Sequence, residues 1–401
     1  MIELQPTDIA HGGEAVARVD GKAHFVDGAM PGERVRGEVV RSKGSWARVE
    51  LREVIEASPQ RVPPPCPHFG ACGGCQWQFA DYPAQLAWKQ RILTGQLTHL
   101  GRLTDPQVRD SIAVGPPYGY RNRVDFEVVD GTTALHRRRS HDLEPVTNCL
   151  VLHPILAETI TRLGDLGGVA AITVRLATAT GAMLAVVAGR VPDGAGGWGC
   201  GVSHRRPHDL KPIIGDGTIT ETVAGVPFRI TGDTFFQNNS AGAETLVSLV
   251  SEALSPGGDE TLLDGYAGGG LFGATVGRSA GRVLAIESSA LGVTDLAHNL
   301  ATAGLEHEIY AGTVEQGAAA LGDAWQVAVV DPPRDGLGAD AVAAIVRGTP
   351  RTIAYVSCDP ASLARDSRHL AGAGYRLDWA VAVDMFPQTF HIEAVAAFSA
   401  T

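Results

Sequence analysis

Thiols and carboxylic acids are the groups in this sequence whose type and spacing indicate chemistry. Three of only six cysteines fall within ten positions, as Cys66, Cys72 and Cys75. In a reducing compartment, clustered cysteines bind metal or do redox chemistry more often than they form disulfides. The cluster therefore predicts a metal or redox site.

A glycine-rich turn follows a strand-like run in residues 261–273, TLLDGYAGGGLFG. Such glycines let the backbone approach a ligand, and parallel sheets bind nucleotides at the carboxyl ends of their strands. Glu287 ends the next strand-like run, where an acid accepts hydrogen bonds from ribose hydroxyls. No Walker lysine follows the glycines, which favours S-adenosylmethionine over ATP hydrolysis. The alternative is that these glycines only form a strand-to-helix turn and bind no ligand.

A second motif, VAVVDPPRDGL, ends an apolar strand at Asp331 and stiffens the following loop with two prolines. Methyltransferases that act on amino groups resemble this motif but usually carry an aromatic residue after the prolines. Arg334 stands there instead, so the motif favours a methylation target other than an exocyclic nitrogen.

Two further reactive groups lie near the C-terminus. Cys358 follows the strand-like run TIAYVS and precedes a helix start at Asp359 and Pro360, where a helix dipole favours the thiolate. Glu393 lies in the apolar segment DMFPQTFHIEAVAAF, where a carboxylate is costly to bury unless it is used or paired. The alternatives are that Cys358 only packs in the core and that Glu393 is solvated or ion-paired. Taken with the glycine-rich turn, these groups indicate methylation of uracil C5, in which a thiolate adds to C6 and a carboxylate removes the C5 proton.

Several elements must position these groups. Alternating residues before position 57, with turns at Gly37 and Gly44, predict short strands of a small β-barrel, and ASPQRVPPPCP marks a boundary. Helical spacing predicts a helix over 83–101 that ends near Gly101. Residues 112–235 predict a mostly antiparallel β-region. Residues 236–401 alternate strands and helices, as in an α/β domain with a largely parallel sheet.

The net charge of −11 argues against bulk attraction to nucleic acid, so local basic clusters matter more. Two such clusters occur, with a solvated charged face as the alternative for each: Arg34, Arg36, Arg41, Lys43 and Arg48 around Trp46, and Arg137, Arg138 and Arg139. The first residues lack a signal-peptide pattern, and no long apolar run occurs, so we expect a cytoplasmic protein without membrane association.

Over essentially its whole length the chain resembles the TRAM-containing, iron-sulfur RNA 5-methyluridine methyltransferase family. The resemblance is carried by the N-terminus, the cysteine cluster and the motifs YRNRVDFEV, RRRSHDLEPVTNC, FFQNN, DPPR, SCDPASLARD and HIEAV, with the glycine-rich loop. It implies a multidomain α/β protein. Its parts would be an OB-like TRAM barrel that binds RNA (1–57), a central β-domain with an iron-sulfur site (58–235) and a Rossmann-like class I methyltransferase domain (236–401).

The resemblance also assigns roles. It implies Cys358 as nucleophile and Glu393 as general base, with S-adenosylmethionine as methyl donor. The implied contacts to this cofactor are Gln237, Tyr266, Glu287 and Asp331. Leu271 and Thr313 depart from the family pattern near the cofactor. We expect these departures to affect the affinity for S-adenosylmethionine rather than the type of reaction.

In iron-sulfur members of the family, a fourth cysteine joins the cluster, and it corresponds to Cys149. Cys66, Cys72, Cys75 and Cys149 are then the implied ligands of a [4Fe-4S] cluster that ties the helix over 83–101 to the β-region, because such a cluster needs four thiolates. Zinc bound by the same thiolates is the alternative. Cys200 matches no motif and is expected to be a spare thiol.

The expected partner is a structured RNA, either transfer or ribosomal, because loops allow a uridine to be unstacked at least cost. Phe235 and Phe236 are candidates for stacking on the extruded base, with core packing as the alternative. The single-copy modules and the acidic balance favour a monomer. Two other functions stay open: a non-catalytic RNA-binding protein on the same fold and a nitrogen-directed RNA methyltransferase.

Overall fold

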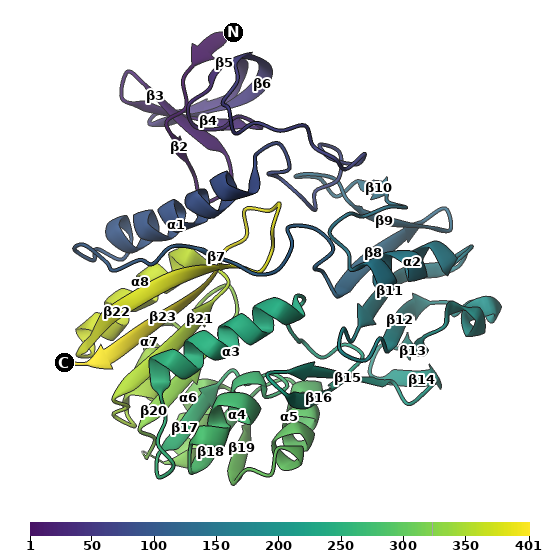
Figure 1. The fold of residues 1–401 in the computed structure, drawn as a ribbon, viewed down its shortest axis with the longest axis vertical. Helices are drawn as coiled ribbons and strands as arrows, with labels where there is room; N and C mark the ends of the chain where they lie inside the picture. Colours follow the sequence, from purple (N-terminus) through teal and green to yellow (C-terminus); the bar gives the residue numbers. More distant parts are fainter. Residues whose placement is uncertain (323) are drawn as a thin grey trace.

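The computed structural model describes residues 1–322 and 324–401 of the chain. Three larger sheets and one hairpin make up its β-structure. In Figure 1, the N-terminal sheet lies at the top, the central sheet at the right and the C-terminal sheet with its helices at the lower left.

The N-terminal sheet has six strands in the order β1-β5-β6-β4-β3-β2. They are β1 (Ile2–Leu4), β2 (Asp8–Ile9), β3 (Ala15–Val19), β4 (Lys22–Asp27), β5 (Arg34–Lys43) and β6 (Trp46–Glu56). Gly44 forms the turn between β5 and β6, as predicted. The predicted turn at Gly37 is wrong, because Gly37 lies inside the ten-residue β5 at a shift of register. A Cβ there would lie 2.7 Å from the carbonyl oxygen of Glu50, so only glycine lets the two long strands approach.

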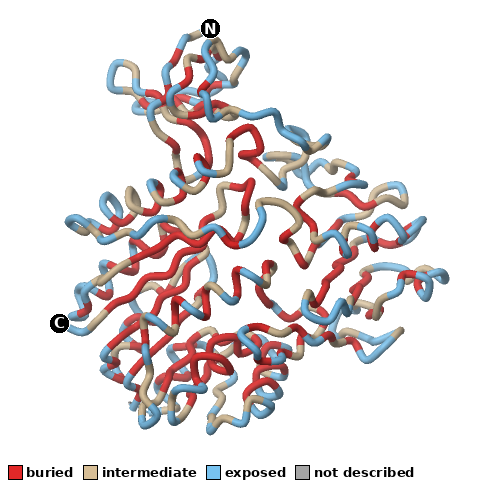
Figure 2. The backbone as a smooth tube through the Cα atoms, in the orientation of Figure 1, coloured by how far each residue is buried: buried red, intermediate tan, exposed pale blue. Residues whose placement is uncertain are grey.

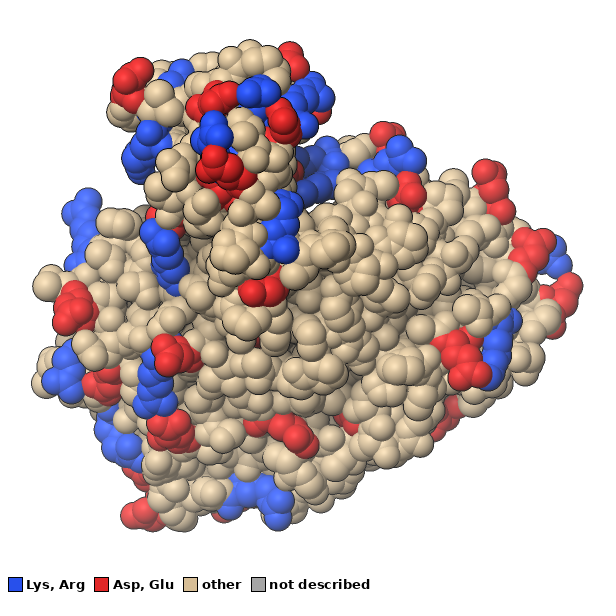
Figure 3. Space-filling view, turned by 45° about the horizontal axis from the view of Figure 1, so that its top comes forward, with Lys and Arg blue, Asp and Glu red and all other residues tan. Residues whose placement is uncertain are grey.

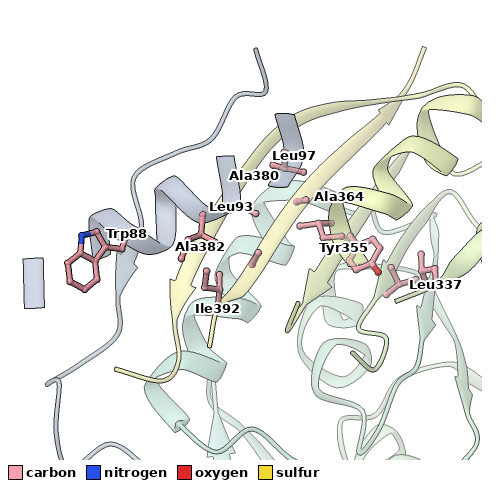
Figure 4. Packing of buried hydrophobic residues seen from close by; sticks show 14 of the residues in the cluster. Trp88, Leu93, Leu97, Leu337, Tyr355, Ala364, Ala380, Ala382 and Ile392 are labelled. Atoms are coloured by element: carbon pink, nitrogen blue, oxygen red, sulfur yellow. The ribbon is translucent and has the colours of Figure 1, made fainter. Parts of the chain in front are cut away.

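Helix α1 (Tyr82–His99) follows an irregular segment that contains the cysteine cluster. Its N-cap is Asp81, whose side chain accepts a hydrogen bond of 2.9 Å from the amide of Ala84. Gly101 directly follows the C-cap, Leu100, so the helix ends close to the predicted position. Leu93 and Leu97 pack α1 against the C-terminal sheet (Figure 4).

The central sheet has seven strands in the order β10-β9-β8-β11-β12-β13-β14. They are β8 (Arg123–Val129), β9 (Thr132–His136), β10 (Leu143–Pro145), β11 (Val169–Leu176), β12 (Met183–Gly189), β13 (Gly201–Arg205) and β14 (Leu210–Ile214). All neighbours are antiparallel except β12 and β13, which confirms the predicted mostly antiparallel region. Helix α2 (Pro154–Arg162) and the 3₁₀ helix η1 (Asp193–Trp198) add to this sheet's core, and β15 (Thr218–Val223) and β16 (Val226–Thr231) form a separate hairpin.

The C-terminal sheet has eight strands in the order β19-β18-β17-β20-β21-β23-β22-β7. They are β7 (Ile112–Ala113), β17 (Thr261–Gly265), β18 (Arg282–Glu287), β19 (His307–Ala311), β20 (Val327–Val330), β21 (Thr352–Ser357), β22 (Tyr375–Asp384) and β23 (Glu393–Ala400). The strands from β19 to β21 are parallel, as predicted, whereas β23 runs antiparallel to both of its neighbours. The short β7 also corrects the expectation for residues 112–235, because its residues pair with β22 of this sheet.

Helices cover both faces of the C-terminal sheet, and its inner strands β17, β18, β20, β21 and β23 are largely buried, whereas β19 and β7 at its edges are not (Figure 2). One hydrophobic core holds residues of α1, α6 (Val314–Leu321), α7 (Gly338–Val346) and α8 (Pro360–Gly372). The other holds residues of α3 (Ser240–Leu254), α4 (Leu271–Thr275), the 3₁₀ helix η2 (Val276–Ser279) and α5 (Ala290–Thr302). In the described part of the chain, no helix combines the length and apolar character needed to cross a membrane.

Candidate active site

Cys358 and Glu393 meet where β21 ends and β23 begins. Ser357 is paired with Ala394 in this antiparallel ladder, so the next positions outward, 358 and 393, face each other. The predicted helix start is confirmed, because Asp359 caps α8 and Pro360 is its first residue. Two C-terminal motifs that are 35 positions apart in the sequence therefore form one site.

The surroundings of Cys358 keep its thiol protonated. Burial raises the pKa of this thiol to about 12, the negative charges of Glu393 and Asp331 raise it as well, and Arg334 opposes them. Desolvation and the two acids act against the thiolate stabilisation that the dipole of α8 would provide.

The two acids are themselves buried. Glu393 is 5% exposed, and burial together with the charge of Asp331 raises its pKa well above the usual value. Burial also raises the pKa of Asp331 to about 7. Asp331 directly follows β20, next to β21 in the sheet, so both acids belong to the same edge. Such neighbouring carboxyls resist ionising together, which acts in the same direction as burial.

The glycine-rich turn lies at the same edge of the sheet, after β17. The Glu287 carboxylate accepts hydrogen bonds from the amides of Gly268 (2.7 Å) and Ser289 (2.6 Å), so it holds the turn. A Cβ added at Gly268 would meet nothing within 4 Å, which leaves open space over this backbone. Tyr266 adopts a left-handed φ of +62° at the end of β17.

Asp264 is a further acid at this turn, and it is fully buried in β17. One carboxylate oxygen accepts a 2.7 Å hydrogen bond from the amide of Gly273, whereas Oδ1 has no hydrogen-bond partner among the described residues. Burial raises the pKa of this carboxyl to about 7. The sequence marks Asp264 as a strand-end acid, but it does not reveal this bond across the turn.

Residues before α3 border the site from another direction. Gln237 is 6% exposed, and its carbonyl accepts a hydrogen bond from the side-chain amide of Asn122. The structure separates the two neighbouring phenylalanines. Phe236 is buried 5.4 Å from Phe228, whereas Phe235 is 60% exposed. Core packing therefore explains Phe236, and only Phe235 is available for stacking. Of the two residues that depart from the family pattern, Leu271 begins α4 and is buried, and Thr313 is the N-cap of α6.

The four predicted ligand cysteines line one cavity of about 640 Å³, together with residues from the N-terminal sheet and the segment before β23. Burial raises the pKa of Cys75 to about 12, and the neighbouring thiols Cys149, Cys72 and Cys66 add to this increase. Within residues 1–322 and 324–401, however, no three His, Cys, Asp or Glu side chains are arranged to hold a metal ion. The structure thus gathers the four cysteines without giving them ligand geometry. Cys200 does not line this cavity.

The predicted basic clusters carry ion pairs. Arg34 and Arg36 of β5 pair with glutamates of the N-terminal part, and Figure 3 shows acidic and basic side chains interspersed there. Arg41 lies over the Trp46 ring, 5.6 Å from its centroid. Two pairs of the arginine run join the central sheet to the N-terminal part, Arg138–Asp27 and Arg139–Glu14, whereas Arg137 pairs with Glu144 of β10 in the central sheet itself.

A largely parallel sheet with a glycine-rich turn and acids at its carboxyl edge defines the fold of an S-adenosylmethionine-dependent methyltransferase. Residues 322–400 match the family model of tRNA (uracil-5-)-methyltransferases. The chain is 34% identical to an uncharacterized RNA methyltransferase of Gloeobacter violaceus, across 97% of this chain and 94% of that one. It is also 34% identical to an uncharacterized RNA methyltransferase of Streptomyces avermitilis, across 98% and 96%.

Among solved structures, the fold is similar to that of the Pyrococcus abyssi tRNA (uracil-54, C5)-methyltransferase in complex with S-adenosyl-L-homocysteine. The TM-score is 0.79 at 24% identity, covering 99% of this chain and 100% of that one. The chain belongs to the RNA methyltransferase family of its relatives, and its C-terminal segment matches the uracil-5 group.

Proposed function

We propose that this enzyme methylates C5 of a uridine in a structured RNA through a covalent adduct with Cys358. The observation that carries the proposal is the register of β21 and β23, which sets positions 358 and 393 side by side next to Asp331. A nucleophile and a base must both reach one uracil ring in this reaction, the nucleophile at C6 and the base at C5.

In the proposed reaction, the Cys358 sulfur adds to C6, and the thiol proton moves to uracil O4 to give an enol. Bound S-adenosylmethionine supplies the methyl group that C5 takes up, and O4 loses its proton as the carbonyl reforms. Glu393 then takes the proton from C5, the carbon–sulfur bond breaks, and the C5–C6 double bond returns. One proton goes back to the thiolate and one is released, so the enzyme is regenerated.

We place S-adenosylmethionine over the glycine-rich turn, beside Gln237, Tyr266, Glu287 and Asp331. Support comes from the open space over Gly268 and from the partnerless buried oxygen of Asp264. Glu287 already accepts hydrogen bonds from two backbone amides. It would therefore hold the turn while it also accepts a hydrogen bond from a ribose hydroxyl.

For Cys66, Cys72, Cys75 and Cys149 we propose a [4Fe-4S] cluster with a structural role, and zinc as the alternative. The donor set fits either group, because four thiols line one cavity and nothing pairs them as disulfides. Such a site would tie the segment before α1 to the central sheet.

We propose that the N-terminal sheet is a TRAM-type module that binds RNA together with the arginine run. Support comes from Arg41 and Trp46, which offer a cation and an aromatic face on β5 and β6. Transfer RNA is the first substrate to test, since the matching family model is named for it. Ribosomal RNA is the second.

The test incubates anaerobically purified enzyme with methyl-labelled S-adenosylmethionine and either unmodified transfer RNA or ribosomal RNA, followed by nucleoside analysis. We expect label in 5-methyluridine from one RNA and none with Cys358→Ala. Label in another nucleoside, or label that survives in Cys358→Ala, would exclude the covalent mechanism and favour a nitrogen-directed enzyme. RNA binding without any label would favour a non-catalytic protein.

A further inference from the structure

The segment between β22 and β23, residues 385–392, leads directly into Glu393. It is an irregular stretch whose position determines where β23 begins. Helix α1, about 300 positions earlier in the chain, supports it through two buried polar side chains, Lys89 and Gln85. Neither residue belongs to the site described above.

Lys89 is fully buried and holds both ends of this segment. Its ammonium donates three hydrogen bonds: to Asp384 Oδ1 (2.6 Å), to the Phe386 carbonyl (3.2 Å) and to the His391 carbonyl (2.7 Å). All three of its protons are used. Because His391 lies two positions before Glu393, the ammonium fixes the backbone directly before the base.

Gln85, one helical turn earlier, holds the middle of the segment. Its side chain exchanges two hydrogen bonds with Gln388, one with the side chain (3.1 Å) and one with the backbone amide (3.0 Å). The Gln388 carbonyl accepts from the amides of Gln76 and Trp77, directly after the cysteine cluster. Gln388 has a left-handed φ of +72°, a conformation that persists only when its surroundings hold it.

Stability alone does not account for a fully buried ion pair here. Desolvation of two charges offsets much of their attraction, and well-packed apolar residues in such places are often at least as stable. Lys89 sits among apolar neighbours of α1, including Leu93 and Ile92, where another apolar side chain would extend the core. Unlike an apolar side chain, the ammonium fixes the positions of three particular oxygen atoms relative to α1.

We propose that Lys89, supported by Gln85, is a positioning residue for the general base Glu393, which it places by holding residues 385–392 against α1. This inference rests on the proposed function, because it assigns Glu393 to removal of the C5 proton. The base acts only after Cys358 has added and the methyl group has been transferred. Displacement of the base therefore slows breakdown of the covalent adduct more than its formation.

The test measures how much enzyme is trapped as a covalent complex with unmodified RNA and S-adenosylmethionine, on denaturing gels, alongside kcat, KM and the RNA Kd. The main variant is Lys89→Met with Asp384→Asn, which removes both charges so that none is left buried alone. A second variant, Gln85→Met, releases Gln388 and keeps the ion pair. Glu393→Gln serves as the reference for loss of the base.

The matched control is Arg351→Met with Glu260→Gln. Arg351 likewise joins a carboxylate to two backbone carbonyls, those of Leu254 and Ser255, but it lies before β21, at the end opposite Cys358. This control loses a comparable set of bonds without touching residues 385–392.

We expect the Lys89→Met/Asp384→Asn enzyme to accumulate adduct as Glu393→Gln does, with kcat lower by about tenfold to 100-fold and RNA Kd unchanged, since small misplacements of reacting groups cost this much. Gln85→Met should show the same change to a smaller degree, and the control should not accumulate adduct.

A fall in kcat without adduct in both α1 variants, while Glu393→Gln does trap it, would overturn the positioning role and leave the proposed function standing. Equal accumulation in the control would also overturn it. Absence of adduct with Glu393→Gln would remove the proposed function and this inference together.

Discussion

His11 of the N-terminal part lies 3.3 Å from Asp359, measured from Nε2 to Oδ2, and Asp359 directly follows Cys358. The N-terminal part of the chain thus touches the turn that carries Cys358, the proposed nucleophile. The other oxygen of Asp359 accepts hydrogen bonds from the amides of Ala361 (2.9 Å) and Ser362 (2.8 Å) as the N-cap of α8. One carboxylate therefore joins two distant parts of the fold at the active site.

The N-cap that Asp359 provides for α8 should stabilise the protein more than its contact with His11 does. Asp359→Ala removes the cap of α8 and should lower the free energy of unfolding by about 1 kcal/mol, as loss of an N-cap does. His11→Ala removes only a partly exposed pair and should change it by less than about 0.5 kcal/mol. Urea denaturation of both variants measures this difference. Equal losses would mean that the contact with His11, rather than the cap, stabilises the turn.

The buried carboxyl of Asp264 should make stability depend on pH. Burial raises its pKa from 3.8 to about 7, so the folded state binds a proton that the unfolded state releases. The stabilising contribution is complete below about pH 4, declines as pH rises towards 7 and is lost above the folded pKa. Asp264→Asn, which keeps an oxygen for the amide of Gly273, should flatten this decline. Urea midpoints from pH 5 to 8 measure it, and parallel curves for both proteins would contradict it.

The cysteine cavity is lined by the four proposed ligand thiols but not by Cys200. Cys149→Ser should lower iron and acid-labile sulfide, or zinc, in protein purified without oxygen, because four thiolates are required. Cys200→Ser, also a partly buried thiol, should bind as much metal as wild type. Metal and sulfide analysis decides between the cluster and zinc. Unchanged metal in Cys149→Ser would exclude this residue as a ligand.

Substitutions at Phe235 and Phe236 distinguish stacking on RNA from packing in the core. Phe236→Ala removes a buried ring and should lower the free energy of unfolding by about 3–5 kcal/mol. Phe235→Ala should leave stability nearly unchanged and weaken RNA binding by about 1–3 kcal/mol if its ring stacks on a base. Thermal unfolding and RNA titration give the two values. Unaltered RNA affinity in Phe235→Ala would rule out stacking.

Part of this architecture could be predicted because its signals are local. Helix α1 follows from helical spacing and a cap, and the turn at Cys358 follows from a strand-like run, Asp359 and Pro360. Alternation of strands and helices likewise indicated the parallel part of the C-terminal sheet. Each of these features depends on neighbours within a few positions.

Other features depend on long-range pairing, which no local pattern records. A glycine inside β5 looks like a turn until the register shows that β6 crosses Gly37 closely. Likewise, Phe235 and Phe236 have the same sequence signal, and only packing against Phe228 separates them. Lys89 carries a sequence signal, a lysine on a mostly apolar helix face, but its partners lie about 300 positions away.

The sequence by itself determined which reactive groups the enzyme has and the turns that present them, since strand, cap and glycine signals are short-range. Only the tertiary structure decided that β23 lies between β21 and β22, which brings Glu393 beside Cys358. Burial also followed from the fold, and it raises the pKa values of the Cys358 thiol and of the Asp331 and Glu393 carboxyls. The physical reason is that pairing of distant strands and exclusion of water depend on the whole chain packing together.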